Sequence, residues 1–368
     1  MAETNNTNTL SISDRYEQIF RKSGIENLVF VDVDQLDSPD DSINGATLQK
    51  MLLDQNPEAF SHFSKKAMEE ASIRFKAKAP SVGPPQNGNN VCLIIQPPST
   101  LSDTRAIAER FVGRSIMARV LDVPGEVVDY VEAYAKHEVK HCAIDTSNLG
   151  EETTLSFDEY ALERLTFEVE ADQNMVDFLR ETGRPEVAQF LTDMRSLSSV
   201  LGYDREHGTS SFLAEGNERT PTMADVNALQ DVKETIFNDI NNVLNPSASP
   251  DDFGDINDLV DKFGEERTLA TLDQLVDQGK YNDRPEMKAY IQNFSDAYRR
   301  QFRGENIPIR TANQTASTSE FEQARNESSP SSTIDPTRNF TNAAQVIDSE
   351  HLNVAAQVTP ETVFEKTV

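Results

Sequence analysis

A five-residue motif at positions 137–141, His-Glu-Val-Lys-His, constrains the fold more than any other feature of this chain. On a helix, two histidines four residues apart are separated by about 40° around the axis and by about one turn along it, so both imidazoles can reach one metal ion. Glu138 projects from an adjoining part of the same face, within reach of water bound to that metal. The motif predicts a helix that supplies two metal ligands and a general base.

The residues before the motif predict that helix. Asp122 and Pro124 are typical of a cap and of a first-turn proline. An apolar stripe with spacings of three and four residues follows, and the two histidines continue it: Val127, Tyr130, Tyr134, His137 and His141. We therefore expect both histidines to face the core. The alternative is that they are ordinary core histidines, each bonded to a backbone carbonyl.

Residues 160–179 predict a second amphipathic helix, with two carboxylates, Glu168 and Asp172, in the middle of its inward stripe. Burying carboxylates is costly unless they are paired or bound to a cation. Glu170 lies about 200° from Glu168 around the axis and cannot share that face. We expect Glu168 to be the third metal ligand and Asp172 to orient a ligating imidazole. The alternative is a pair of carboxylates on a helix surface.

The two predicted helices together resemble the gluzincin branch of zinc metallopeptidases, in which a second helix carries Glu-x-x-Ala-Asp. Glu168, Ala171 and Asp172 match that second motif, and the resemblance covers roughly residues 120–182. It implies an α+β, zincin-like core in which Zn²⁺ is bound by His137, His141 and Glu168. It also implies peptide-bond hydrolysis, with Glu138 activating a zinc-bound water.

Lys140 departs from the uncharged residue that is usual at this position of the motif. The departure leaves open a metal-binding relative without catalytic activity. For stabilising an oxyanion, the segment 201–209 offers three candidates, of which we favour His207 over Tyr203 and Arg205. The alternative for His207 is that it caps a helix end or faces water.

Composition limits the partners. The formal net charge is −28, and no long basic stripe is present, which argues against binding to nucleic acid or to an anionic membrane surface. No apolar run approaches the length of a membrane span. We therefore expect a peptide or protein substrate, no nucleic acid and no membrane.

The first 13 residues lack the features of a secretory signal, so the cytoplasm is the expected compartment, with leaderless export left open. Only two cysteines, Cys92 and Cys142, are present, so a disulfide framework is not expected and a reducing compartment is compatible. Cys142 follows His141 directly but is rotated from it by about 100°, so a small buried thiol is expected there and not a ligand.

The pattern along the chain predicts four segments: a disordered N-terminus at 1–13, the zincin-like α+β domain at 14–215, a helical extension at 216–304 and a disordered acidic tail at 305–368 that could bind a partner. Strands are expected at 27–33 and 91–96, separated in part by a Pro/Gly/Asn-rich loop at 80–90. Helices are expected at 48–75 and 104–121, and in the extension at 222–243, 256–263, 269–278 and 285–302.

Two functions from other classes remain open. Asp32 and Asp34 follow an apolar strand, an arrangement similar to the first motif of haloacid-dehalogenase-like phosphatases, which would make the protein a magnesium-dependent phosphatase. The other alternative is a non-enzymatic, acidic helical interaction protein in which the histidines are structural and the tail recruits partners.

Overall fold

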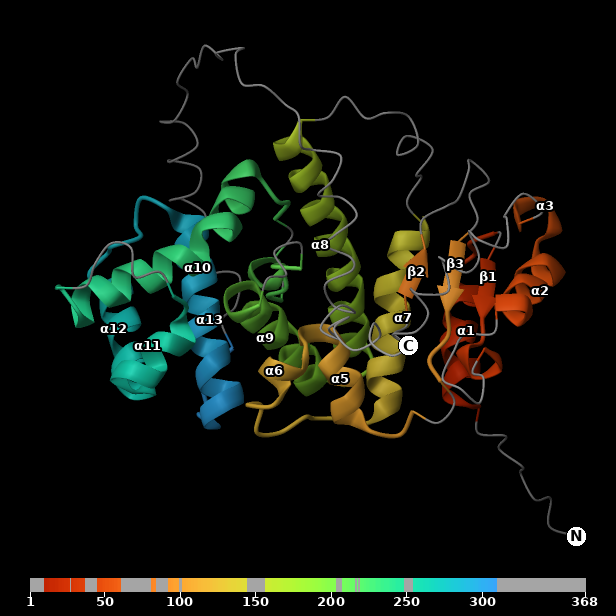
Figure 1. The fold of residues 1–368 in the computed structure, drawn as a ribbon, viewed down its shortest axis with the longest axis horizontal. Helices are drawn as coiled ribbons and strands as arrows, with labels where there is room; N and C mark the ends of the chain where they lie inside the picture. Colours follow the sequence, from red (N-terminus) through yellow and green to blue (C-terminus); the bar gives the residue numbers. More distant parts are fainter. Residues whose placement is uncertain are drawn as a thin grey trace, which may run out of the picture. The chain divides into compact units, whose positions relative to one another are not determined.

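The computed structural model describes residues 10–26, 28–36, 45–60, 81–83, 92–98, 101–143, 156–202, 207–215, 217, 219–247 and 254–309. These residues are mostly helical and include one small mixed sheet, so the fold is broadly α+β (Figure 1). None of the described helices is long and apolar enough to cross a membrane.

Helix α1 (Ile12–Lys22) begins the described fold. Its capping box pairs Ser11 with Asp14, whose backbone N–H donates to Ser11 Oγ at 3.1 Å, and the first turn is thereby stabilised. The helix therefore starts inside the segment predicted to be disordered, and that prediction is wrong at residues 12 and 13. Residues 1–9 lie outside the described part of the chain.

Three strands form the sheet, in the order β1 (Leu28–Val31), β3 (Cys92–Ile95), β2 (Ser81–Gly83). β1 pairs with β3 in parallel and β2 pairs with β3 antiparallel. The strands predicted at 27–33 and 91–96 are confirmed, in shorter form. β2 falls inside the predicted loop at 80–90, because a three-residue strand among Pro, Gly and Asn gives no alternating pattern to recognise.

Successive residues of a strand point to opposite faces, and the sheet separates two apolar clusters accordingly. Phe30 and Ile94 belong to the main core, which also contains Tyr16 and Phe20 of α1. On the other face, β1 and β3 pack with helix α2 (Gly45–Gln55) in a smaller cluster of Val29, Val31, Val33, Leu36, Leu48, Leu52 and Ile95. Helix α3 (Pro57–Phe60) follows α2, and the rest of the helix predicted at 48–75 lies outside the described residues.

The helix predicted at 104–121 is two helices, α5 (Thr104–Val112) and α6 (Arg114–Met117), because Gly113 adopts a φ of 81° and interrupts the hydrogen-bonding pattern. The motif helix is α7 (Val127–Ala143), which packs against α1, α8 (Phe157–Glu181) and β2 (Figure 1). The prediction that Asp122 caps this helix is wrong, because Asp122 accepts its hydrogen bond from the Val123 backbone N–H, before α7 begins. Instead, the carboxylate of Asp129 accepts a hydrogen bond from the Glu126 backbone N–H at 2.7 Å.

Helix α9 (Pro185–Leu201) packs against α8 and leads to the short turn η3 (Ser210–Phe212). The extension contains α10 (Met223–Leu244), α11 (Ile256–Phe263), α12 (Glu265–Asp277) and α13 (Pro285–Arg303), which confirms its four predicted helices. α13 packs along α9. The predicted boundary between residues 215 and 216 stays a prediction, and most of the predicted tail, from residue 310 on, lies outside the described residues.

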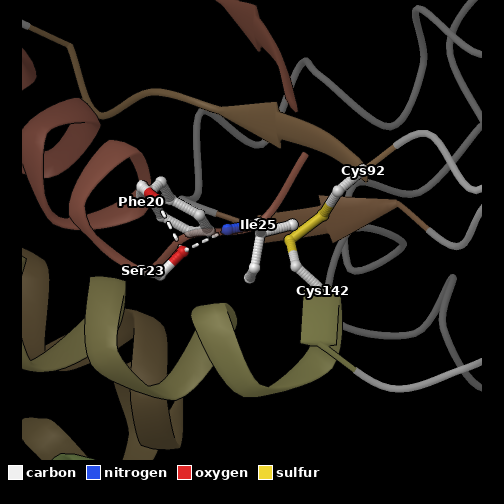
Figure 2. Close-up of a disulfide and its surroundings, with 5 residues drawn as sticks. All are labelled: Phe20, Ser23, Ile25, Cys92 and Cys142. Atoms are coloured by element: carbon white, nitrogen blue, oxygen red, sulfur yellow. Dashed lines mark hydrogen bonds between the residues drawn. A yellow bond between two sulfur atoms is a disulfide. The ribbon is translucent and has the colours of Figure 1, made fainter. Parts of the chain in front are cut away.

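A disulfide joins Cys92 at the start of β3 to Cys142 in the last turn of α7, with their Cα atoms 5.6 Å apart (Figure 2). The expectations that the chain has no disulfide and that Cys142 is a free thiol are therefore wrong. The fold brings the end of α7 beside β3, at a distance typical of disulfides. Because the two residues are 50 positions apart, no local pattern in the sequence indicated this proximity.

Candidate metal centre

Three of the predicted site residues converge on one point. Nε2 of His137 lies 3.0 Å from Nε2 of His141. Oε2 of Glu168, on α8, lies 3.5 Å from the first of these nitrogens and 3.6 Å from the second. A tetrahedral zinc ion with bonds of about 2.0–2.1 Å requires donor atoms about 3.3 Å apart. The three donors therefore have the spacing that a single metal ion needs.

Burial supports a cation at this point. His137 and Glu168 are each 4% exposed, while His141 lies closer to the surface. Oε2 of Glu168 is buried and accepts no hydrogen bond of good geometry from the described residues, although imidazole nitrogens surround it. A buried carboxylate oxygen without a donor is costly, and a metal ion would satisfy it. Two imidazoles and one carboxylate are a donor set that zinc accepts.

Asp172 contacts His137, one of the two predicted ligating imidazoles. Its Oδ1 lies 2.8 Å from Nδ1 of His137, which directs the other ring nitrogen, Nε2, toward the centre. The same oxygen lies 2.8 Å from Nη2 of Arg195 on α9, and Thr209 donates a 2.5 Å hydrogen bond to Oδ2. The alternative of a core histidine bonded to a backbone carbonyl does not describe His137, because its partner is a carboxylate.

Arg195 and Thr209 were not identified from the sequence. Both are buried, and they are separated from Asp172 by 23 and 37 residues. The charge of Arg195 within a largely apolar helix was the one signal in the sequence that it needs a buried partner. The identity of that partner, Asp172, is defined only by the packing of α9 on α8. Sequence spacing identifies neighbours on one helix, not contacts between helices.

The charges around the centre favour ionised carboxylates. Burial alone would raise the pKa of Glu168, yet His207, His141 and His137 together hold that pKa well below its usual value. Burial would likewise raise the pKa of Asp172, but Arg195 and His137 hold it well below its usual range. The surroundings of both carboxylates therefore favour the negatively charged form, which metal binding requires.

Glu138 lies next to His137 on α7 and is partly buried. Burial raises the pKa of its carboxyl above the usual value, while His137 and His141 act in the opposite direction. The pKa of Tyr16, on α1, is raised first by burial and then by the Glu138 carboxylate, which places Glu138 toward α1. Lys140 is partly exposed.

His207 lies beside the centre but is not one of its three donors. Its Nε2 is 3.1 Å from Oε2 of Glu168, and its side chain is 26% exposed. The fold thus brings His207 to the predicted place at the edge of the site, and its catalytic role stays a prediction. Tyr203 and Arg205 lie outside the described residues.

The acidic pair Asp32 and Asp34 has a local structural role. The Asp34 backbone N–H donates to Oδ1 of Asp32 at 3.0 Å, and Gln35 donates to Oδ2 at 2.7 Å, so Asp32 caps the short turn η1 (Val33–Gln35). Within the described ranges, the cluster of His137, His141 and Glu168 is the one group of three metal-type side chains. The magnesium-phosphatase alternative gains no support from these contacts.

No protein-family model, curated protein or solved structure matches this chain. The resemblance to gluzincins therefore depends on the two motifs and on the geometry of the centre.

Proposed function

We propose that this protein is a zinc-dependent peptidase with a zincin-like core formed by α7, α8 and the sheet. The observation that carries the proposal is the convergence of His137, His141 and Glu168 on one point, with Glu138 beside it on the same helix. The sequence suggested the same three donors, from the helical spacing within each motif and from the resemblance to gluzincins.

Three residues of the chain, Glu138, His207 and Asp172, have defined tasks in the proposed reaction. Zinc, when bound, would supply Lewis acidity that polarises a peptide carbonyl and acidifies water. Glu138 would accept a proton from the attacking water and deliver it to the leaving amine. His207 would donate a hydrogen bond to the oxygen that becomes negative in the transition state. Asp172 would hold His137 in the orientation that presents Nε2.

Metal analysis is the first test. Purified protein should contain about one zinc ion per chain, and His137→Ala should lose it, because two remaining ligands hold zinc poorly. His351→Ala is the control, because His351 lies outside both sequence motifs, and it should retain zinc. Protein without stoichiometric zinc, whose metal content His137→Ala leaves unchanged, would exclude the proposal.

Hydrolysis is the second test. With a peptide library as substrate, Glu138→Gln should retain zinc but lose hydrolysis, because the amide is too weak a base. Glu170→Gln, on the exposed side of α8, is the matched control and should cleave at the wild-type rate. Undiminished cleavage by Glu138→Gln would remove that residue from the mechanism. Bound zinc without cleavage of any peptide would favour the non-catalytic alternative.

A further inference from the structure

The two histidine ligands are supported in different ways. His137 is buried and is oriented by Asp172, at 2.8 Å from Nδ1. His141 is more exposed, and among the described residues it lies within hydrogen-bonding or ion-pairing distance only of His137 and Glu168, which are themselves members of the centre. No described side chain outside the centre therefore orients His141 through a polar contact.

His141 also lies in the last turn of α7, which ends at Ala143. The last carbonyl groups of a helix lack partners within the helix, and helix ends open more readily than helix centres. The position of His141 therefore depends on whatever holds this turn in place. The next residue, Cys142, supplies that restraint through its disulfide to Cys92 (Figure 2).

The other end of the disulfide is firmly anchored. Cys92 belongs to β3, the central strand of the sheet, and it pairs in register with Leu28 of β1. The turn after α1 lies beside the disulfide, where Ser23 Oγ donates to the Phe20 carbonyl at 2.6 Å and accepts from the Ile25 N–H at 3.3 Å (Figure 2). The disulfide thus fixes the end of the ligand helix to the central strand of the sheet.

We propose that Cys92 and Cys142 form a redox-active pair whose oxidation state sets the metal affinity of the centre, and this inference rests on the proposed zinc site. The disulfide form holds His141 in place and binds zinc tightly. The dithiol form releases the last turn of α7 and binds zinc more weakly. A protein dithiol is the class of reductant that would carry out the conversion.

The exchange is balanced in atoms and electrons. Cys142 is the more exposed of the two residues, and Cys92 is 4% exposed, so the first thiolate of the reductant attacks Sγ of Cys142. The bond between the two cysteines breaks, and Cys92 leaves as a thiolate. The second thiol of the reductant then displaces Cys142. The reductant ends as a disulfide, and the two cysteines have gained two electrons and two protons.

The experiment measures zinc affinity in each redox state by competition with a chromogenic chelator. Full-length wild-type protein is measured oxidised, after reduction by a phosphine that is then removed by desalting under anaerobic conditions, and after reoxidation. We expect reduction to weaken zinc binding about tenfold, a loss comparable to removing a residue that orients a ligand, and reoxidation to restore it. Hydrogen exchange at the last turn of α7 should accelerate in the reduced protein.

The double variant Cys92→Ala/Cys142→Ala is the control. It should bind zinc as the reduced protein does and should not respond to reductant. If that variant does not fold, the reversible change in the wild type decides, with circular dichroism checking that the helices persist. Affinities within twofold of each other in the two redox states would overturn the coupling and leave the zinc site standing. Absence of zinc binding by the oxidised protein would overturn the site and the coupling together.

Discussion

At the scale of single residues, Asp172 connects three parts of the fold. It contacts His137 of α7 and Arg195 of α9 through one oxygen, and Thr209, which precedes η3, through the other. The side chain is fully buried, so its negative charge depends on these partners. The position of the His137 imidazole is therefore coupled to the packing of α8 on α9.

Asp172→Asn should weaken zinc binding about 10- to 100-fold, because an amide supports the ligating imidazole less well than a carboxylate does. Competition titration measures the change. Asp177→Asn is the matched control on the same helix: Asp177 is exposed and pairs only with Arg180 among the described residues, at 3.3 Å, so its loss should leave the affinity unchanged. Equal affinities for the two variants would show that Asp172 does not orient His137.

His207→Ala should retain one zinc ion per chain, since His207 is outside the group of three donors. Its peptide hydrolysis should fall about 100-fold, the loss expected when one donor to a developing oxyanion is removed. Zinc content and the rate at saturating substrate separate these effects. Loss of zinc in this variant would instead make His207 a ligand.

At the scale of elements, the start of α7 depends on Gly125. This residue adopts a φ of 78°, and a Cβ atom added to it would lie 2.6 Å from Cγ2 of Val187 on α9 and 2.8 Å from Oδ2 of Asp129. Glycine is thus required both by the backbone conformation and by the close approach of the Val187 side chain. A larger residue would displace the segment that begins the ligand helix.

Gly125→Ala should lower the free energy of unfolding by about 2–3 kcal/mol, the sum of left-handed backbone strain and a steric clash. Gly183→Ala is the control, because Gly183 has a similar φ of 76° but open space around the added Cβ. It should cost about 1 kcal/mol, from the backbone alone. Urea denaturation measures both, and equal losses would show that the contact with Val187 is unimportant.

Some of these elements were predictable from the sequence, and others were not. Helices α7 and α8 were predictable because their stripes have a helical period over four or more turns, and the candidate donors His137, His141 and Glu168 lie on those stripes. Sequence periodicity did not predict the short strand β2, the cap supplied by Asp129, or the contacts of Arg195 and Thr209 with Asp172. They depend on which elements pack together, as does the disulfide between Cys92 and Cys142, and local periodicity does not contain that information.

At the scale of the molecule, a buried ion pair connects the C-terminal helices to α9, which packs against the α8 helix of the candidate metal centre. Asp193 of α9 is 1% exposed, and Arg300 of α13 binds it through two nitrogens, at 2.7 and 2.9 Å. Gln189 and Gln301 each donate a further hydrogen bond of 2.7 Å to the same carboxylate. The Asp193 carboxylate in turn raises the pKa of Arg300, although burial alone would lower it.

Arg300→Ala should lower the free energy of unfolding by about 3–5 kcal/mol, because it leaves the Asp193 carboxylate buried without its cation. Arg303→Ala is the control on the same helix. Arg303 pairs with Glu266 and Glu305, which are 76% and 30% exposed, so the loss of these solvent-accessible pairs should cost less than about 1 kcal/mol. Urea denaturation followed by circular dichroism measures both variants. If the wild type unfolds in a single transition and Arg300→Ala unfolds in two, this ion pair couples the unfolding of α13 to that of α9. If the two variants show equal small losses in the free energy of unfolding, apolar packing alone holds α13 against α9.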